Sequence, residues 1–525
     1  MHRAVLAFWS WVGETGGMQG NSDSKMELLD AGVLVGHLVP DGSVYAFLAE
    51  HRRRLFPDAM FTDLFPSDRG RPSVPAEVVA TVMVLQSLEG LSDRDAIDAL
   101  RTDLKWKVAC GVSLTDEGFH PTVLTLWRNR LRGSGAPERI FDAVRQVVAE
   151  TGVLAKRTRR ALDSTLLDDA VATQDTVTQL TSVIRRVRHQ VPVAAEVEVV
   201  AHDYDSGAKA GCAWDDPQAR AELVSGLVND ALAILERLEG VALDADEAQL
   251  VGLLALVAGQ DVEPGNGEGT WRIARRTAPD RVISTVDPEA RHMHKSRSTY
   301  RDGFKAHVAV EPETGIITAV DLTPANVPDG ATGVELLAGE APGLEVLADS
   351  AYGSGQTRAA LTDAGHRQSI KAMPLRAAVP GGFTKGDFRI DLAAATVTCP
   401  AGETAHITTT GRAVFGRRCR DCPLRSCCTT AKKGRVLDIH PHEAELLAAR
   451  KRSTTPEFIE SYRRWRPMVE RSIAWLVANG HRKVRYRGVE RNRLGLATRA
   501  AAINLRRLIN LGLHTGPNGW AITAT

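Results

Sequence analysis

Three carboxylates occupy positions that suit chemistry better than packing. Asp349 directly follows the apolar run 344–348, which predicts a short buried strand, and a predicted helix begins at Gln356. Asp163 lies in a similar run, and Glu470 lies in a long predicted helix near the C-terminus. Functional sites in open α/β sheets gather at the carboxyl ends of strands. An aspartate before a helix can also serve only as its cap, but the two further carboxylates favour a site.

Five of the seven cysteines cluster in the chain. Two residues separate Cys419 from Cys422, a gap that lets both sulfur atoms face one metal ion. Cys399, together with Cys427 or Cys428, would complete a four-thiolate zinc site, and we place Cys427 in the candidate set. Cys399, the first of these ligands along the chain, is a single cysteine rather than one of a closely spaced pair. The alternative is therefore that the cysteines bind no metal and remain reduced in a loop. An odd, clustered set does not resemble a secreted disulfide framework, so we expect a cytoplasmic protein.

Residues 40–150 predict helices only. Ser92 and Asp95 form a capping box, with a hydroxyl at the N-cap and a carboxylate three residues later. A later helix opens near His120, and its Arg128 and Arg130 are available to phosphates. Short helices joined by tight polar turns suit a DNA-binding bundle of the helix-turn-helix kind, although many small bundles bind nothing.

The middle of the chain predicts a mixed sheet. The segments 304–310 and 315–322 flank a turn as a hairpin rich in β-branched residues. With the run around Asp163, the run before Asp349 and a strand near 368–372, the order is strand, hairpin, helix, strand, helix, strand. Extended structure is also predicted at 282–288. Longer helices are predicted at 176–188, 219–238, 247–258, 456–478 and 494–513.

The net charge of +1 conceals a strong asymmetry. Residues 412–511 hold 24 Lys and Arg against 8 Asp and Glu, a net +16, and the rest of the chain carries −15. Residues 195–270 are acidic, with 16 acids and 3 bases. A basic segment of this size is the electrostatic footprint expected of nucleic-acid binding, with a solvated charged face as the alternative.

The length of 525 residues allows a large core and several domains. With 43% apolar and 25% charged residues the composition is that of a globular protein. No run of about 18 apolar residues occurs, so no membrane span is expected. We expect a disordered extension (1–30), a helical DNA-binding domain (31–150), a catalytic domain (151–168, 282–378 and 452–512), a helical insertion (169–281) and a cysteine-rich insertion (379–451).

Five short motifs follow one another along the chain. They are Ala-Leu-Asp-Ser-Thr at 161–165, Gly-Phe-Lys-Ala-His at 303–307, Thr-Pro-Ala-Asn-Val-Pro-Asp at 323–329, Ala-Asp-Ser-Ala-Tyr at 348–352, and the set Tyr462, Arg466, Glu470 and Arg471. In this order they resemble the DDE transposases of bacterial insertion sequences, over about residues 30–510. The family's last motif has a basic residue seven positions after the glutamate. Here that residue is Val477, so no basic role is transferred to it.

The resemblance implies an α/β fold with an RNase H-like mixed sheet and helices, beside an all-helical N-terminal domain, a helical insertion and a small cysteine-rich insertion. It also implies that Asp163, Asp349 and Glu470 are catalytic and hold two Mg²⁺ or Mn²⁺ ions. Two such ions, about 4 Å apart, stabilise the attacking and leaving oxygens of an in-line displacement. Phosphate contacts are expected from Lys305, His307, Arg466 and Arg471.

The implied enzyme is a DDE transposase that binds terminal inverted repeats and catalyses Mg-dependent cleavage and transfer of DNA strands. Its partners would be double-stranded DNA at the transposon ends and at the target. We expect a homodimer on DNA, associated with the nucleoid. The alternatives are a DNA-binding regulator, an inactive transposase relic, and a metal-dependent nuclease that does not rejoin ends. The presence of all three acids argues against a relic.

Overall fold

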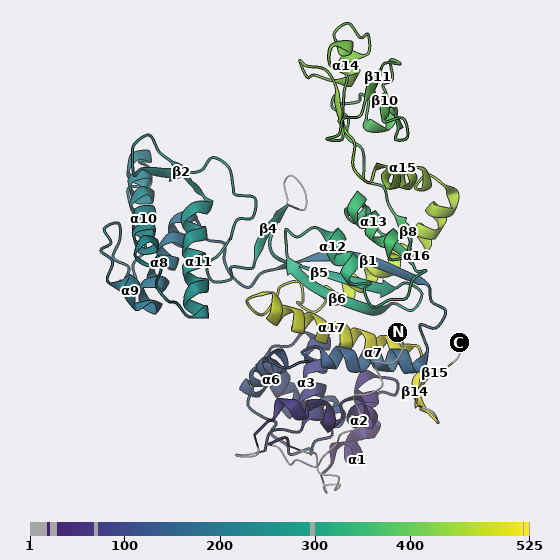
Figure 1. Ribbon diagram of the computed structural model, residues 1–525. Coiled ribbons are helices and arrows are strands. Elements are labelled where there is room, and N and C mark those ends of the chain that lie inside the picture. The colour runs from purple at the N-terminus through teal and green to yellow at the C-terminus, as the bar shows by residue number, and fades with distance from the viewer. Residues whose placement is uncertain (1–17, 21–28, 68–71, 295–299, 518, 524–525) are drawn as a thin grey trace.

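The computed structural model describes residues 18–20, 29–67, 72–294, 300–517 and 519–523. The predicted extension, 1–30, lies almost entirely outside these ranges. Figure 1 shows a central sheet with the N-terminal helices packed below it, a helical body to one side and a small body above it.

The N-terminal part of the described chain is built from helices. The predicted capping box is present: the Ser92 hydroxyl accepts the Asp95 N–H at 3.1 Å, and the Asp95 carboxylate accepts the Ser92 N–H at 3.4 Å. Helix α3 is buried on nearly every side because most of its residues are apolar. The main helices are α1 (Ala31–Val35), α2 (Val44–Leu55), α3 (Ala76–Glu89), α4 (Asp93–Thr102), α5 (Leu104–Cys110), α6 (Thr122–Arg132) and α7 (Arg139–Thr151).

A mixed sheet forms the centre of the molecule, as predicted. In the described residues it has six strands in the order β4-β5-β1-β7-β8, with β6 beside β5. Strand β1 is antiparallel to β5 and parallel to β7, and β7 is parallel to β8. The predicted hairpin is formed by β5 and β6. The strands are β1 (Arg159–Asp168), β4 (Arg291–His294), β5 (Tyr300–Glu311), β6 (Ile316–Pro324), β7 (Glu345–Ala348) and β8 (Arg367–Ile370).

Helix α17 (Val489–Asn510) joins the sheet to the N-terminal helices. Its Asn504 side chain donates to the Ile317 carbonyl at 2.7 Å and accepts the Ile317 N–H at 2.8 Å. One hydrophobic core contains residues of α2, α3, α7, β1, β5 and α17, so the N-terminal helices and the sheet fold against one another. The other helices on the sheet are α12 (Asp329–Glu335), α13 (Gly355–Asp363) and α16 (Pro456–Val477).

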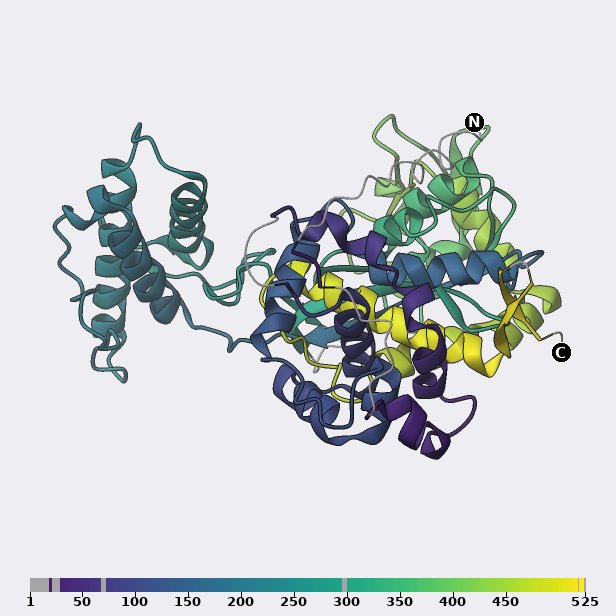
Figure 2. The same cartoon turned by 90° about the horizontal axis from the view of Figure 1, so that it is seen from below.

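The helical body has a hydrophobic core of its own. Figures 1 and 2 both show it extending away from the sheet. The two ends of this body meet, because the Gln174 N–H donates to the Ile283 carbonyl at 2.8 Å. Its elements are α8 (Thr176–Gln190), α9 (Pro192–Ala195), α10 (Pro217–Arg237), α11 (Ala245–Gln260), β2 (Val262–Pro264) and β3 (Trp271–Ile273). The extended segment predicted at 282–288 forms no strand and contributes one isolated bridge, Val282 with Arg291.

The small body above the sheet contains the clustered cysteines. Its short strands are β9 (Arg389–Asp391), β10 (Thr396–Thr398), β11 (Thr404–His406), β12 (Arg412–Val414) and β13 (Val436–Asp438), with the single turn α14 (Arg425–Cys428). Helix α15 (Glu443–Arg452) leads back to α16, and the chain ends in the hairpin β14 (Leu513–Gly516) and β15 (Gly519–Ile522). Within the described ranges, no helix has the length and apolar character needed to cross a membrane.

Candidate active site

Asp163 lies on β1, and Asp349 directly follows the neighbouring parallel strand β7. In the pairing of β1 with β7, Ala161 is opposite Leu347. Each aspartate is two residues beyond that pair, so the two side chains share one face of the sheet and the register brings them side by side. Asp349 also accepts a backbone N–H at 2.9 Å and caps the short helix Ser350–Tyr352. Capping and a place in a carboxylate pair are therefore compatible roles for Asp349.

Arg466 binds Asp163 from helix α16. Its Nη2 atom lies 2.9 Å from Oδ1 of Asp163, and its Nη1 atom donates to the carbonyl of Leu162. Both charged side chains are largely buried, with 7% and 16% of their surface exposed. Burial raises the pKa of Asp163, Arg466 lowers it, and the carboxylate of Asp349 raises it. Arg466 thus offsets part of the repulsion between the two carboxylates.

Glu470 lies one turn beyond Arg466 on α16, and Tyr462 lies one turn before it. The spacing of four residues puts all three on one side of the helix. The Glu470 side chain is exposed. Burial raises the pKa of Tyr462, and Arg466 opposes this shift. The charges of Asp349, Asp163 and Glu470 raise it further, so all three carboxylates act on one phenol group.

The three carboxylates fit a divalent cation by their chemistry. Oxygen ligands of this kind, completed by water and substrate phosphate, are those that Mg²⁺ prefers, and a cation would offset the repulsion between the two aspartates. Among the described residues, no three His, Cys, Asp or Glu side chains are grouped so that they could hold a metal ion. Asp163 and Asp349 would supply two of the ligands of such a cation, and Glu470 would have to turn toward them.

Lys305 and His307 are buried on β5, so neither can meet a DNA phosphate without moving. Nζ of Lys305 donates to the Val327 carbonyl at 2.7 Å and lies 3.1 Å from Oδ1 of Asp329. Nε2 of His307 is 2.9 Å from the Thr323 hydroxyl. Burial lowers the pKa of His307 to about 4, so its ring is neutral near pH 7. The sequence predicts phosphate contacts for Lys305 and His307 and indicates no role for Asp329, although this residue closes one of the five motifs.

The arginines predicted to contact DNA differ in their surroundings. Arg128 is engaged within the fold: it pairs with Asp93 at 2.8 Å and donates to the Gln86 side chain at 2.7 Å. Arg130, two residues further along α6, is exposed. Arg471 is also exposed, beside Glu470 on α16. Of these three, Arg130 and Arg471 are open to a DNA backbone in this structure.

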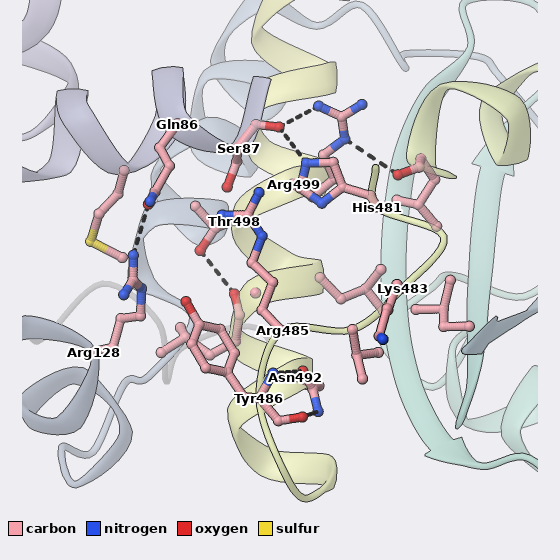
Figure 3. Close-up of a pocket in the computed structure, with 17 residues that line it drawn as sticks. Gln86, Ser87, Arg128, His481, Lys483, Arg485, Tyr486, Asn492, Thr498 and Arg499 are labelled. Carbon is pink, nitrogen blue, oxygen red and sulfur yellow. Dashed lines mark hydrogen bonds between the residues drawn. The ribbon is translucent and has the colours of Figure 1, made fainter. Parts of the chain in front are cut away.

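A cavity of ≈ 70 Å³ lies where helix α3 meets the segment 481–499. Figure 3 shows basic side chains from this segment around it. Nε2 of His481 lies 2.8 Å from the Ser87 carbonyl, and Arg499 donates to the Leu88 carbonyl at 2.9 Å. These contacts satisfy carbonyls at the C-terminal end of α3, where the helix dipole favours positive charge. Part of the basic segment thus binds the protein's own backbone.

The clustered cysteines divide into two groups. Cys399, Cys419 and Cys422 line one cavity, and so does Cys428. Cys427, which we placed in the candidate zinc set, is exposed and does not line it. The structure therefore brings Cys428, rather than Cys427, together with the other three.

The mixed sheet with its helices is consistent with an RNase H-like DDE domain beside a helical N-terminal region. Comparison with protein families agrees with this class. Residues 35–130 match a transposase domain (DUF772), and residues 398–509 match a transposase DDE domain. The two matches indicate a DDE-type transposase of an insertion-sequence family. The second match contains Glu470 and the clustered cysteines, whereas Asp163 and Asp349 lie outside both. No curated protein and no solved structure matches the chain.

Proposed function

We propose that this protein binds the terminal inverted repeats of its element, cleaves the DNA strands there and joins them to a target. The observation that carries the proposal is the placement of Asp163 beside Asp349 with the helix of Glu470 alongside. Two Mg²⁺ or Mn²⁺ ions held by these carboxylates would activate the attacking oxygen and stabilise the leaving oxygen of an in-line displacement.

The chain's own residues would prepare this site in different ways. Arg466 orients the Asp163 carboxylate through the ion pair at 2.9 Å. Lys305 and His307 stiffen the neighbouring strand from inside the fold. Arg471 is exposed beside Glu470 and is available to a phosphate of the bound strand. Each of these roles positions groups before the reaction, which is where much of the catalysis of phosphoryl transfer originates.

The catalytic assignment is tested by removing one negative charge at a time. Asp163→Asn, Asp349→Asn and Glu470→Gln should each abolish end cleavage with Mg²⁺ or Mn²⁺, because an amide is a much weaker ligand for a hard cation. Binding to the ends should persist in a gel-shift assay. Glu460→Gln, an exposed glutamate on the same helix, is the matched control and should cut normally.

A variant of any of the three acids that cuts at the wild-type rate would remove that residue from the site. Cleavage without joining of the ends to target DNA would assign the protein as a nuclease rather than a transposase. End binding with no cleavage by the wild-type protein would favour a DNA-binding regulator.

For the DNA interface, we propose that the N-terminal helices select the ends and that the basic segment 412–511 adds affinity on double-stranded DNA, with two copies of the chain on the paired ends.

The exposed Arg94 on α4 and Arg130 on α6 are offered as phosphate contacts. Replacing both with Gln should weaken binding and reduce the slope of log K against log salt by about two, since each lost phosphate contact releases about one counterion fewer. Arg145→Gln on α7 is the control. An unchanged salt slope in the double variant would exclude this surface.

A further inference from the structure

Four cysteines from separate segments of the small body line one cavity of ≈ 20 Å³. Cys399 directly follows β10, Cys419 ends the short helix Gly416–Cys419, and Cys428 ends α14. Cys422 lies in the turn between these two helices and lines the same cavity. All four are free thiols. The volume is of the order needed for a single water-sized guest, which suits one ion rather than an organic ligand.

The neighbouring Cys427 has a different environment. It is exposed, whereas Cys428 packs against the core of the small body. Successive residues on a helical turn point about 100° apart, so only one of the two can face the cavity. The sequence left this choice open, and the packing of α14 decides it.

The small body is poor in apolar residues for its size. Its strands are three residues long, and Figure 1 shows α14, β10 and β11 well away from the sheet. A small unit of this kind buries too little apolar surface to offset its conformational entropy, and a bound metal is a common remedy. Its buried core consists of Phe388, Val397, Ala405, Ala413, Phe415, Leu437 and Ile439.

Cationic side chains lie close to the cysteine-bearing segments. The backbone N–H of Arg435 donates to Sγ of Cys419 at 3.4 Å, and its guanidinium donates to the Cys428 carbonyl at 3.4 Å. Arg425 donates to the Cys419 carbonyl at 3.1 Å. Four thiolates around a divalent ion leave a net charge of −2, which these cations offset. Arg435 and Arg425 also tie the cysteine-bearing segments to one another.

We propose that Cys399, Cys419, Cys422 and Cys428 bind one structural Zn²⁺ ion. In the part of the chain that is described, no three such side chains are grouped as ligands of one ion, so binding would require the thiols to turn toward the ion. Four Zn–S bonds form at about 2.3 Å, and the four thiol protons pass to solvent. Soft thiolate ligands select zinc over Mg²⁺, so the ion is separate from those proposed at the carboxylates. The site does not depend on the proposed catalytic function.

The test is the zinc content of the full-length protein, purified under reducing conditions without chelator. The wild type should carry about one zinc per chain, as expected of one four-thiolate site. Replacing zinc with Co²⁺ should give the visible absorption of a tetrahedral thiolate complex. Cys428→Ser should lose most of the metal, and Cys427→Ser, the matched control one residue away, should keep it. Cys428→His, which supplies another zinc ligand, should restore binding if Cys428→Ser folds poorly.

Two results would overturn the proposal. Wild-type protein with an ordered small body and neither bound zinc nor a cobalt spectrum would leave the cysteines as ordinary reduced thiols. Loss of zinc in Cys427→Ser with retention in Cys428→Ser would show that the other cysteine completes the site.

Discussion

At the scale of single residues, Arg466 has the most direct influence on the carboxylate pair. Its guanidinium contacts both the Asp163 carboxylate and the Leu162 carbonyl, and the side chain is almost fully buried. Lysine would keep the charge but could not hold both acceptors in one plane. In the proposed site these contacts would let Arg466 position Asp163 rather than react.

Arg466→Lys should therefore lower the rate of end cleavage by about 100-fold, the scale expected when a catalytic group is displaced by about 1 Å. In this variant either the Asp163 carboxylate or the Leu162 carbonyl loses its hydrogen-bond partner. The loss should lower the free energy of unfolding by about 1–3 kcal/mol. Cleavage rates, end binding and thermal unfolding measure these effects. Arg463→Lys, on an exposed part of the same helix, is the control. Cleavage by Arg466→Lys at the wild-type rate would show that the ion pair is only structural.

At the scale of elements, the end of α3 and the segment after α16 form a charged junction. Arg499 donates to carbonyls of α3 at Leu88 and of α16 at Trp475, so one side chain on α17 binds the ends of two other helices. His481 contacts the carbonyl of Ser87 in the same place. Burial lowers the pKa of His481 to about 4, and the charges of Arg499 and Arg485 contribute to the shift.

This pKa makes the junction sensitive to acid. The unfolded chain takes up a proton near pH 6.5, whereas the folded His481 resists protonation until about pH 4. Stability is therefore present above pH 6.5 and is lost as the pH falls toward 4, by about 2 kcal/mol at pH 5. His481→Gln, which keeps an N–H donor, should reduce the loss of urea resistance between pH 7 and pH 5.

The exposed His514 provides the control, because its replacement with Gln should leave the pH dependence unchanged. The buried His307 also has a pKa of about 4, but it contributes equally to every variant and cancels in the comparison. Equal pH dependence in His481→Gln and the wild type would show that the junction does not titrate in this way.

At the scale of the whole molecule, the helical body extends away from the sheet (Figures 1 and 2). Its core is separate from the core shared by the sheet and the N-terminal helices. Its ends are held together by the hydrogen bond from Gln174 to Ile283. A short loop can therefore replace it without stretching the chain.

Replacing residues 175–282 with a short Gly/Ser linker should leave the rest of the protein folded. Circular dichroism should show retained strand signal with helix content reduced by α8, α10 and α11, and unfolding should remain cooperative. The matched variant is deletion of residues 31–150, which should not fold because it exposes the core of α17 and the sheet. Failure of the first variant to fold would mean that the helical body supports the sheet.

Local patterns in the sequence determined much of this architecture. The apolar runs around Asp163 and before Asp349, the hairpin, and the capping box at Ser92 all form as predicted. These features depend on side-chain periodicity and on hydrogen bonds between near neighbours. The segment 282–288 did not form a strand, because extended composition does not supply a pairing partner.

Tertiary structure decided which of the candidate residues are available for chemistry. Lys305, His307 and Arg128 are residue types that suit DNA, but packing between elements buries them or binds them to internal partners. The choice of Cys428 over Cys427 also depends on how α14 packs. Sequence spacing determined which residue types lie near one another along the chain, whereas burial and ion pairing depend on contacts between elements hundreds of residues apart, such as that of Arg466 with Asp163.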